Sequence, residues 1–262
     1  MTQAVDLYWT EQGAGPPMLI LHGLYGSGRN WSRHVRWLAE QWRVITPDLR
    51  NHGRSPHAEP MDYPAMAEDV LRLMDTADCA QAVLLGHSMG GKVAMNLALR
   101  WPERVRALVA VDIAPVEYGN GDGEHARILA AMAAIDPGQV KQRSEVDAAL
   151  QQAVDSAMVR QFLLTNLERA GQGWRWRIPV QRLQAALPAL AAFPAVQGHY
   201  DGPALFLRGA LSAYQDDRHA AEVRRLFPQA ELAVIADAGH WLHVEQPAAF
   251  AESLRQWLAR LD

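Results

Sequence analysis

The chain has 262 residues, of which 49% are hydrophobic and 21% are charged, as in ordinary globular domains. Its formal net charge of −4 gives no electrostatic reason to expect nucleic acid or an anionic membrane as a partner. The single cysteine, Cys79, excludes an internal disulfide and a metal site built from cysteines. The length suits one large α/β domain with an inserted subdomain.

The beginning of the chain does not resemble a secretory signal. Residues 1–9 contain neither a basic start nor a long apolar stretch. No window of the sequence approaches the roughly 18 apolar residues of a membrane span. We therefore expect a cytoplasmic protein without stable membrane association.

Short apolar runs alternate along the chain with segments of helical periodicity. This alternation predicts an α/β fold with a mostly parallel central sheet flanked by helices. The predicted strands are residues 5–10, 18–21, 43–46, 82–85, 105–111, 204–207 and 232–235. The predicted helices around them are residues 31–41, 61–76, 91–98 and 246–261.

The alternation stops between residues 116 and 200, where no clear buried strand is predicted. A polar and aromatic stretch, 171–177, follows the helical part of this segment. We expect a helical cap inserted into a core made of residues 1–115 and 201–262. Its predicted helices are residues 124–134, 144–154 and 156–168.

One serine, Ser88, stands in a turn between a predicted strand and a predicted helix. The sequence Gly-His-Ser-Met-Gly at residues 86–90 follows an apolar run and precedes a helical segment. Small residues two positions before and after the serine allow a sharp turn that lifts its hydroxyl above a parallel sheet. The pattern predicts a nucleophilic serine at the start of a helix.

Other reactive side chains also follow predicted strands. Ligands of open α/β sheets bind beyond the carboxyl ends of the strands, where Asp112 and His240 are expected to join Ser88. A hydroxyl, a carboxylate and an imidazole at one edge are the parts of an activated serine. Their order along the chain, Ser then Asp then His, is that of the α/β-hydrolases.

The chain resembles the α/β-hydrolase superfamily over nearly its full length. Within it, the chain is similar to the small bacterial esterases and thioesterases of the YbfF type and to their mitochondrial relatives. The segments that carry the resemblance are residues 22–27, 47–55, 86–90, 111–115 and 239–241. The resemblance implies a nucleophile at Ser88, a base at His240 and an oxyanion hole formed by the backbone N–H groups of Leu24 and Met89.

The acid of the predicted triad has more than one candidate. In much of the superfamily it follows the strand that is residues 204–207 here, but Ser212 occupies that place. Asp112 ends the preceding strand of the sheet and is our first choice, as in the YbfF-like group. Asp216 and Asp217 remain alternatives.

Substrate is expected to bind between this edge of the sheet and the inserted segment. Aromatic and long apolar side chains of the insert should set substrate preference, and residues near the turns of the core should complete the pocket. The predicted substrate-binding residues are His22, Tyr25, Phe162, Leu164, Trp174, Trp176, Trp241 and His243.

The sequence thus predicts a hydrolase of small to medium acyl esters, with acyl thioesters as a further substrate class. No metal, cofactor or nucleic acid is expected, and the oligomeric state stays open. One alternative is a carbon–carbon hydrolase or a lyase that uses the same triad, because a fold does not fix the substrate. Another is a ligand-binding protein without catalytic activity.

Overall fold

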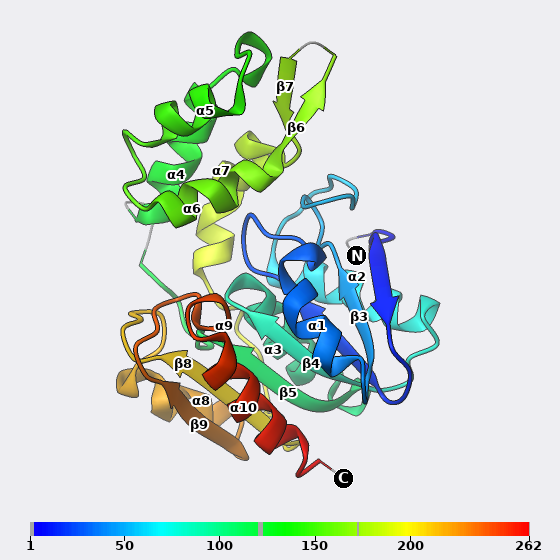
Figure 1. The fold of residues 1–262 in the computed structure, drawn as a ribbon. Coiled ribbons are helices and arrows are strands. Elements are labelled where there is room, and N and C mark those ends of the chain that lie inside the picture. Colours follow the sequence, from blue (N-terminus) through cyan, green and yellow to red (C-terminus); the bar gives the residue numbers. More distant parts are fainter. Residues whose placement is uncertain (1–2, 120–122, 172, 262) are drawn as a thin grey trace.

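The computed structural model describes residues 3–119, 123–171 and 173–261. Its centre is a seven-stranded sheet in the order β1-β3-β2-β4-β5-β8-β9 (Figure 1). All neighbours are parallel except β1, which is antiparallel to β3. The strands are β1 (Trp9–Gln12), β2 (Pro17–Leu21), β3 (Arg43–Pro47), β4 (Ala82–His87), β5 (Val105–Val111), β8 (Ala204–Gly209) and β9 (Ala230–Ile235). The predicted fold class is confirmed.

Helices cover both faces of the sheet. Side chains of a strand alternate between its two faces, so Leu19 and Leu21 of β2 join one core while Met18 and Ile20 join the other. Burial on both faces explains why the strands are continuous apolar runs in the sequence. One face carries α1 (Ser32–Leu38) and α10 (Pro247–Leu258), with α9 (Leu242–Glu245) before α10. The other face carries α2 (Tyr63–Thr76), α3 (Met89–Arg100) and α8 (Ala220–Leu226).

The predicted first strand is displaced along the chain. Residues 5–10 were expected to form it, but β1 begins at Trp9. Val5 N donates instead to Asp69 Oδ1, and Tyr8 N donates to Ser55 Oγ. The backbone before β1 therefore donates to the side chains of Asp69 and Ser55 instead of pairing with a strand. The pattern of apolar residues does not reveal such side-chain hydrogen bonds.

The segment between β5 and β8 forms a separate group of elements beside the sheet (Figure 1). The helix predicted for residues 156–168 is wrong in its second half, because α6 ends at Leu163 and a hairpin begins at Leu167. Gly171, with a φ of +59°, lies between the strands of this hairpin. The elements are α4 (Glu124–Ala134), α5 (Arg143–Leu150), α6 (Ala157–Leu163), β6 (Leu167–Ala170), β7 (Gly173–Trp176) and α7 (Val180–Ala191).

Within the described residues, no helix is both long and apolar enough to cross a bilayer.

Cys79 is buried, as expected for a small side chain that fills space in the core.

A buried ion pair fixes the loop after β3 to α2. Arg50 and Asp69 are both fully buried, and Arg50 Nε lies 2.5 Å from Asp69 Oδ2. The guanidinium also donates to Pro60 O and to Ala65 O. Burial raises the pKa of Asp69, and the hydrogen bonds from Arg50 and from Val5 N oppose this shift.

Arg50→Met should therefore destabilise the protein by about 3–5 kcal/mol, because it leaves a buried carboxylate without its guanidinium. Urea denaturation followed by circular dichroism measures the loss. Arg72→Met is the matched control, since its pair with Asp6 lies on the surface, and it should leave the transition midpoint nearly unchanged. Equal effects of the two substitutions would contradict the assignment.

Candidate active site

Three predicted residues meet at the carboxyl edge of the sheet. Ser88 follows β4, Asp112 follows β5, and His240 lies in the loop after β9. His240 Nδ1 donates to Asp112 Oδ2 over 2.7 Å. Ser88 and His240 line one cavity together. The edge of the sheet thus collects a hydroxyl, an imidazole and a carboxylate from distant parts of the chain.

The turn at Ser88 depends on the two glycines that lie two positions before and after it, Gly86 and Gly90. Ser88 has a φ of 52°, in a region that non-glycine residues rarely adopt. A Cβ on Gly86 would lie 2.2 Å from Gly90 O, and a Cβ on Gly90 would lie 2.3 Å from Leu21 O. The two glycines therefore allow α3 to start directly against β4 and β2. This geometry is that of a nucleophile elbow.

The Asp112 carboxylate is buried, and each of its two oxygens accepts at least one hydrogen bond. Oδ1 accepts from Gly209 N over 3.0 Å, and Oδ2 accepts from both His240 Nδ1 and Ser212 Oγ. Burial raises the pKa of Asp112 to about 6, and the hydrogen bonds from Ser212 and Gly209 oppose this shift. Burial also lowers the pKa of His240. At neutral pH the pair therefore consists of a carboxylate and a neutral imidazole.

The other candidate acids have different partners. Asp216 accepts from Arg218 N and Arg218 Nε, and Asp217 lies 3.2 Å from Arg208 on the surface. Ser212, at the position where a carboxylate was considered, donates to Asp112 instead of replacing it. The geometry favours Asp112.

Two histidines near Ser88 are held by the backbone. His22 Nδ1 donates to Gly23 O, and its Nε2 accepts from Leu49 N. Burial lowers the pKa of His22 to about 4, so it stays neutral and braces the loop after β2. His87 Nε2 donates to His240 O over 2.9 Å, which anchors the loop that carries the imidazole.

A residue that the sequence analysis did not select, Tyr214, covers His240. The two rings are stacked with centroids 4.1 Å apart and planes at 26°. The Tyr214 hydroxyl lies 3.1 Å from His125 Nε2, on the first turn of α4. Tyr214 follows Ser212 in the loop after β8, so the expectation that ligands bind beyond the carboxyl ends of the strands could have identified it. His125 does not follow a strand of the sheet, and nothing in the sequence marked it as a site residue.

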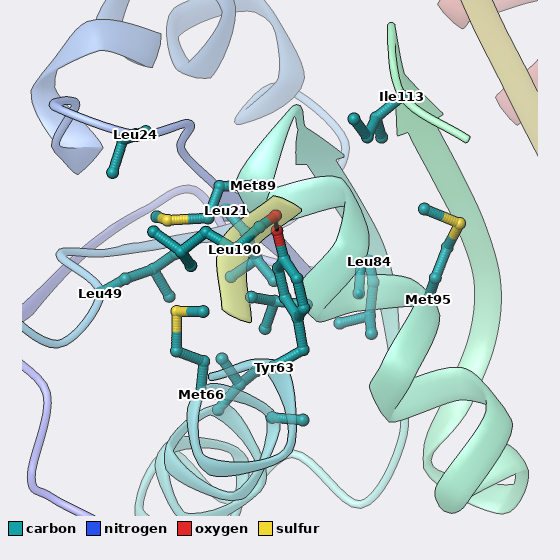
Figure 2. Close-up of a cluster of buried hydrophobic side chains, with 14 of the residues drawn as sticks. Leu21, Leu24, Leu49, Tyr63, Met66, Leu84, Met89, Met95, Ile113 and Leu190 are labelled. Carbon is teal, nitrogen blue, oxygen red and sulfur yellow. Dashed lines mark hydrogen bonds between the residues drawn. The ribbon is translucent and has the colours of Figure 1, made fainter. Parts of the chain in front are cut away.

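The first cavity at Ser88 is mostly apolar, and we call it the Lys92 cavity because Lys92 also lines it. Its volume is about 310 Å³. Leu24, Met89 and Ile113 line it from the core, and Leu190 lines it from α7; Figure 2 shows these side chains around Tyr63. Met89 is the first residue of α3, so its N–H has no acceptor within the helix.

The second cavity at Ser88, which we call the His240 cavity, has a volume of about 190 Å³. The predicted residues Tyr25, Phe162 and Trp241 all line it. The Phe162 and Trp241 rings pack with centroids 5.0 Å apart, which joins α6 to the loop of His240. The insert and the core therefore build this cavity together.

A third cavity of about 200 Å³ contains His22 and His243 together with Phe162 and Trp241. The His243 ring is buried and stacks on Trp31, with centroids 4.5 Å apart. Of the predicted substrate-binding residues, Tyr25, Phe162 and Trp241 thus line a cavity together with Ser88. His22 and His243 line the third cavity, which Ser88 does not reach.

The other three predicted substrate-binding residues lie within the insert, and none of them lines these three cavities. Leu164 is buried in the apolar cluster that this segment shares with one face of the sheet. Trp174 Nε1 donates to Lys141 O, and Trp176 Nε1 donates to Met132 O. The two tryptophans bind the backbone of the same segment through their indole N–H groups and so hold it together.

Comparison with known proteins agrees with this geometry. Residues 16–247 match the family model described as the alpha/beta hydrolase fold. The chain belongs to the α/β-hydrolase family, as its motifs indicated.

Individual relatives can be named. The chain is 41% identical over 251 residues to the mouse sn-1-specific diacylglycerol lipase ABHD11, covering 93% of this chain and 81% of the relative. It is 37% identical over 248 residues to the Esterase YbfF of Escherichia coli K12, covering 95% of each. A solved structure titled "Marine microorganism esterase" superposes with a TM-score of 0.93 at 37% identity, covering 97% of this chain and 100% of the other. The similarity to the YbfF-like group is confirmed.

The close packing at Gly90 predicts that a larger residue there would lower the stability of the fold. Gly90→Ala should destabilise the protein by more than about 3 kcal/mol, beyond the usual range for overpacking, because the new Cβ would meet backbone atoms of β2. Thermal denaturation measures this. Gly123→Ala is the control, since nothing lies within 4 Å of its added Cβ, and a comparable loss there would contradict the explanation.

Proposed function

We propose that Ser88, His240 and Asp112 form the catalytic triad of a serine esterase. The observation that carries the proposal is the 2.7 Å hydrogen bond between His240 and Asp112 beside a serine on a nucleophile elbow. The chain is a hydrolase of the carboxylesterase type, and relatives named esterase and diacylglycerol lipase support small-molecule esters as its substrates.

In the proposed reaction, His240 takes the proton of Ser88 as the hydroxyl attacks the ester carbonyl. The backbone N–H groups of Leu24 and Met89 stabilise the resulting oxyanion. His240 then gives the proton to the leaving alcohol, which leaves an acyl group on Ser88. Water, activated by His240, releases the acid and restores the serine. Acyl thioesters would react in the same way, with a thiol as the leaving group.

Asp112 has two tasks in this scheme. It accepts from His240 Nδ1, so Nε2 is the nitrogen left to take the serine proton. Its negative charge also stabilises the imidazolium that forms in the transition state. Ser212 and Gly209 support the carboxylate through the remaining hydrogen bonds.

We also propose that residues 116–200 act as a cap on a core of residues 1–115 and 201–262. Support comes from the cavities at Ser88, which contain residues of both parts. Leu187 and Leu190 of α7 line the Lys92 cavity, and Phe162 of α6 lines the His240 cavity. In this proposal the core performs the reaction and the cap shapes the space for the substrate.

The function is tested by labelling and turnover. A fluorophosphonate should label the wild-type protein at Ser88 and should fail to label Ser88→Ala. Ser88→Ala and His240→Ala should each lose nearly all hydrolysis of p-nitrophenyl butyrate while the circular dichroism spectrum stays that of the wild type. Wild-type turnover by either variant, or labelling without turnover, would reject the proposal.

A second comparison tests the acid. Asp112→Asn should lower kcat/KM by up to about 10⁴-fold, as the same change of the triad aspartate does in serine proteases, because the asparagine favours the wrong tautomer of His240. Ser212→Ala should cost far less, because it removes one neutral donor and keeps the charge.

Asp216→Asn is the matched control for Asp112→Asn and should be close to neutral, as should Asp217→Asn. All variants are assayed together on the same ester at neutral pH. If Asp112→Asn kept most activity while one of the other two asparagine variants lost it, the acid would lie after β8.

A further inference from the structure

A lysine is buried in the wall of the Lys92 cavity. Lys92 lies one helical turn after Ser88 on α3, and only 1% of it is exposed. An ammonium in an apolar environment is costly unless it finds acceptors. Lys92 Nζ donates to Ala191 O and Ala192 O, each 2.8 Å away.

These acceptors stabilise the positive charge. The two carbonyls end α7, where the helix dipole is negative and no intrahelical donor is available. Lys92 Nζ also lies 4.7 Å from the ring centroid of Tyr118. Burial nevertheless lowers the pKa of Lys92 to about 7, and the nearby Glu117 opposes this shift. An anion bound in the cavity would favour the charged form further.

The proposed mechanism makes no use of this charge. An ammonium carries three hydrogens, and the two carbonyls account for two of them. No hydrogen-bond acceptor for the third is found among the described residues, and Lys92 lines the cavity. A neutral acyl chain offers no acceptor at that place.

The position of Lys92 relative to Ser88 limits the length of such a ligand. Their Cα positions are about 6 Å apart along the helix axis, and helical side chains lean back towards the N-terminus. The cavity of about 310 Å³ has room for a short acyl chain. The rest of the cavity wall is mostly apolar. Such a wall suits a ligand with methylene groups between one polar end at Ser88 and another at Lys92.

We infer that the Lys92 cavity accepts the acyl group of a short dicarboxylic acid whose far carboxylate binds Lys92 Nζ. This inference rests on the proposed function, since Ser88 would attack the esterified carboxyl of the same molecule. The free carboxylate would take part in no bond change and would only position the acyl chain. Among the described residues that line the cavity, Glu124 carries a carboxylate of its own, and it also lines the His240 cavity.

Two esters with the same number of acyl carbons test this inference. Ethyl pentanoate ends in a methyl group, and monoethyl glutarate ends in a carboxylate. The wild-type enzyme should show a kcat/KM at least about tenfold higher for monoethyl glutarate, because a buried polar group discriminates against an analogue without its partner. Lys92→Gln should remove this preference, because the amide can still donate to the carbonyls of α7 but carries no charge.

Arg160→Gln is the matched control. Arg160 is also a buried cation that donates to two backbone carbonyls, Val154 O and Asp155 O, but it lies outside the cavities at Ser88. This variant should keep the preference for monoethyl glutarate. Loss of the preference in Arg160→Gln would mean that any weakening of the insert abolishes it, and would overturn the role of Lys92.

The remaining outcomes separate this inference from the proposed function. An absent or reversed preference in the wild-type enzyme overturns the inference, and so does an equal loss on both esters in Lys92→Gln. If Lys92→Gln does not fold, glutarate should still inhibit the wild-type hydrolysis of ethyl pentanoate at a concentration about tenfold lower than pentanoate does. Equal inhibition would reject the inference. Hydrolysis of ethyl pentanoate by Ser88→Ala would instead reject the triad.

Discussion

The close approach of α3 to β2 and β4 determines where Ser88 can stand. The backbone turns at Ser88 with a φ of 52°, a conformation that costs about 1–3 kcal/mol and persists only where the surroundings enforce it. They do so here, because every residue of α3 from Met89 to Leu99 is buried. Gly86 and Gly90 remove the side chains that would push the helix away from the sheet. The reactive turn is thus a product of core packing, and its strain is offset by the burial of α3.

The partners of Ser88 follow from the same sheet. Parallel strands end at one edge, so β5 and the loop after β9 bring Asp112 and His240 beside β4 although they lie 128 residues apart. Asp112 has a φ of 52° directly after β5 and finds donors from the β8 end, Gly209 N and Ser212 Oγ. This arrangement explains why a serine, Ser212, stands where much of the superfamily has its acid. The serine donates a hydrogen bond to a carboxylate that comes from the neighbouring strand.

The fold of the core and the meeting of Ser88, Asp112 and His240 at one edge of the sheet were predictable because their sequence signals are local. A buried strand is an apolar run, an elbow is five adjacent residues, and parallel strands gather their ends without further information. The insert was harder, because helical periodicity shows an apolar face but not the surface that it covers. Trp174 and Trp176 were expected in the pocket for their size, yet their indoles bind backbone carbonyls of the insert. Tyr214 and His125 meet only through tertiary packing.

In the proposed function, the contacts between residues 116–200 and the sheet separate the reaction from the choice of substrate. Tyr63 Oη donates to Leu190 O, Lys92 Nζ donates to Ala191 O, and Tyr25 O accepts from Asn166 Nδ2. Two of these bonds hold backbone carbonyls at the end of α7, so they do not depend on the side chains that α7 turns towards the cavity. Those side chains can change the shape of the space while the helix stays in place. The proposed triad, whose positions the sheet fixes, can therefore act on different acyl groups without a change in its own geometry.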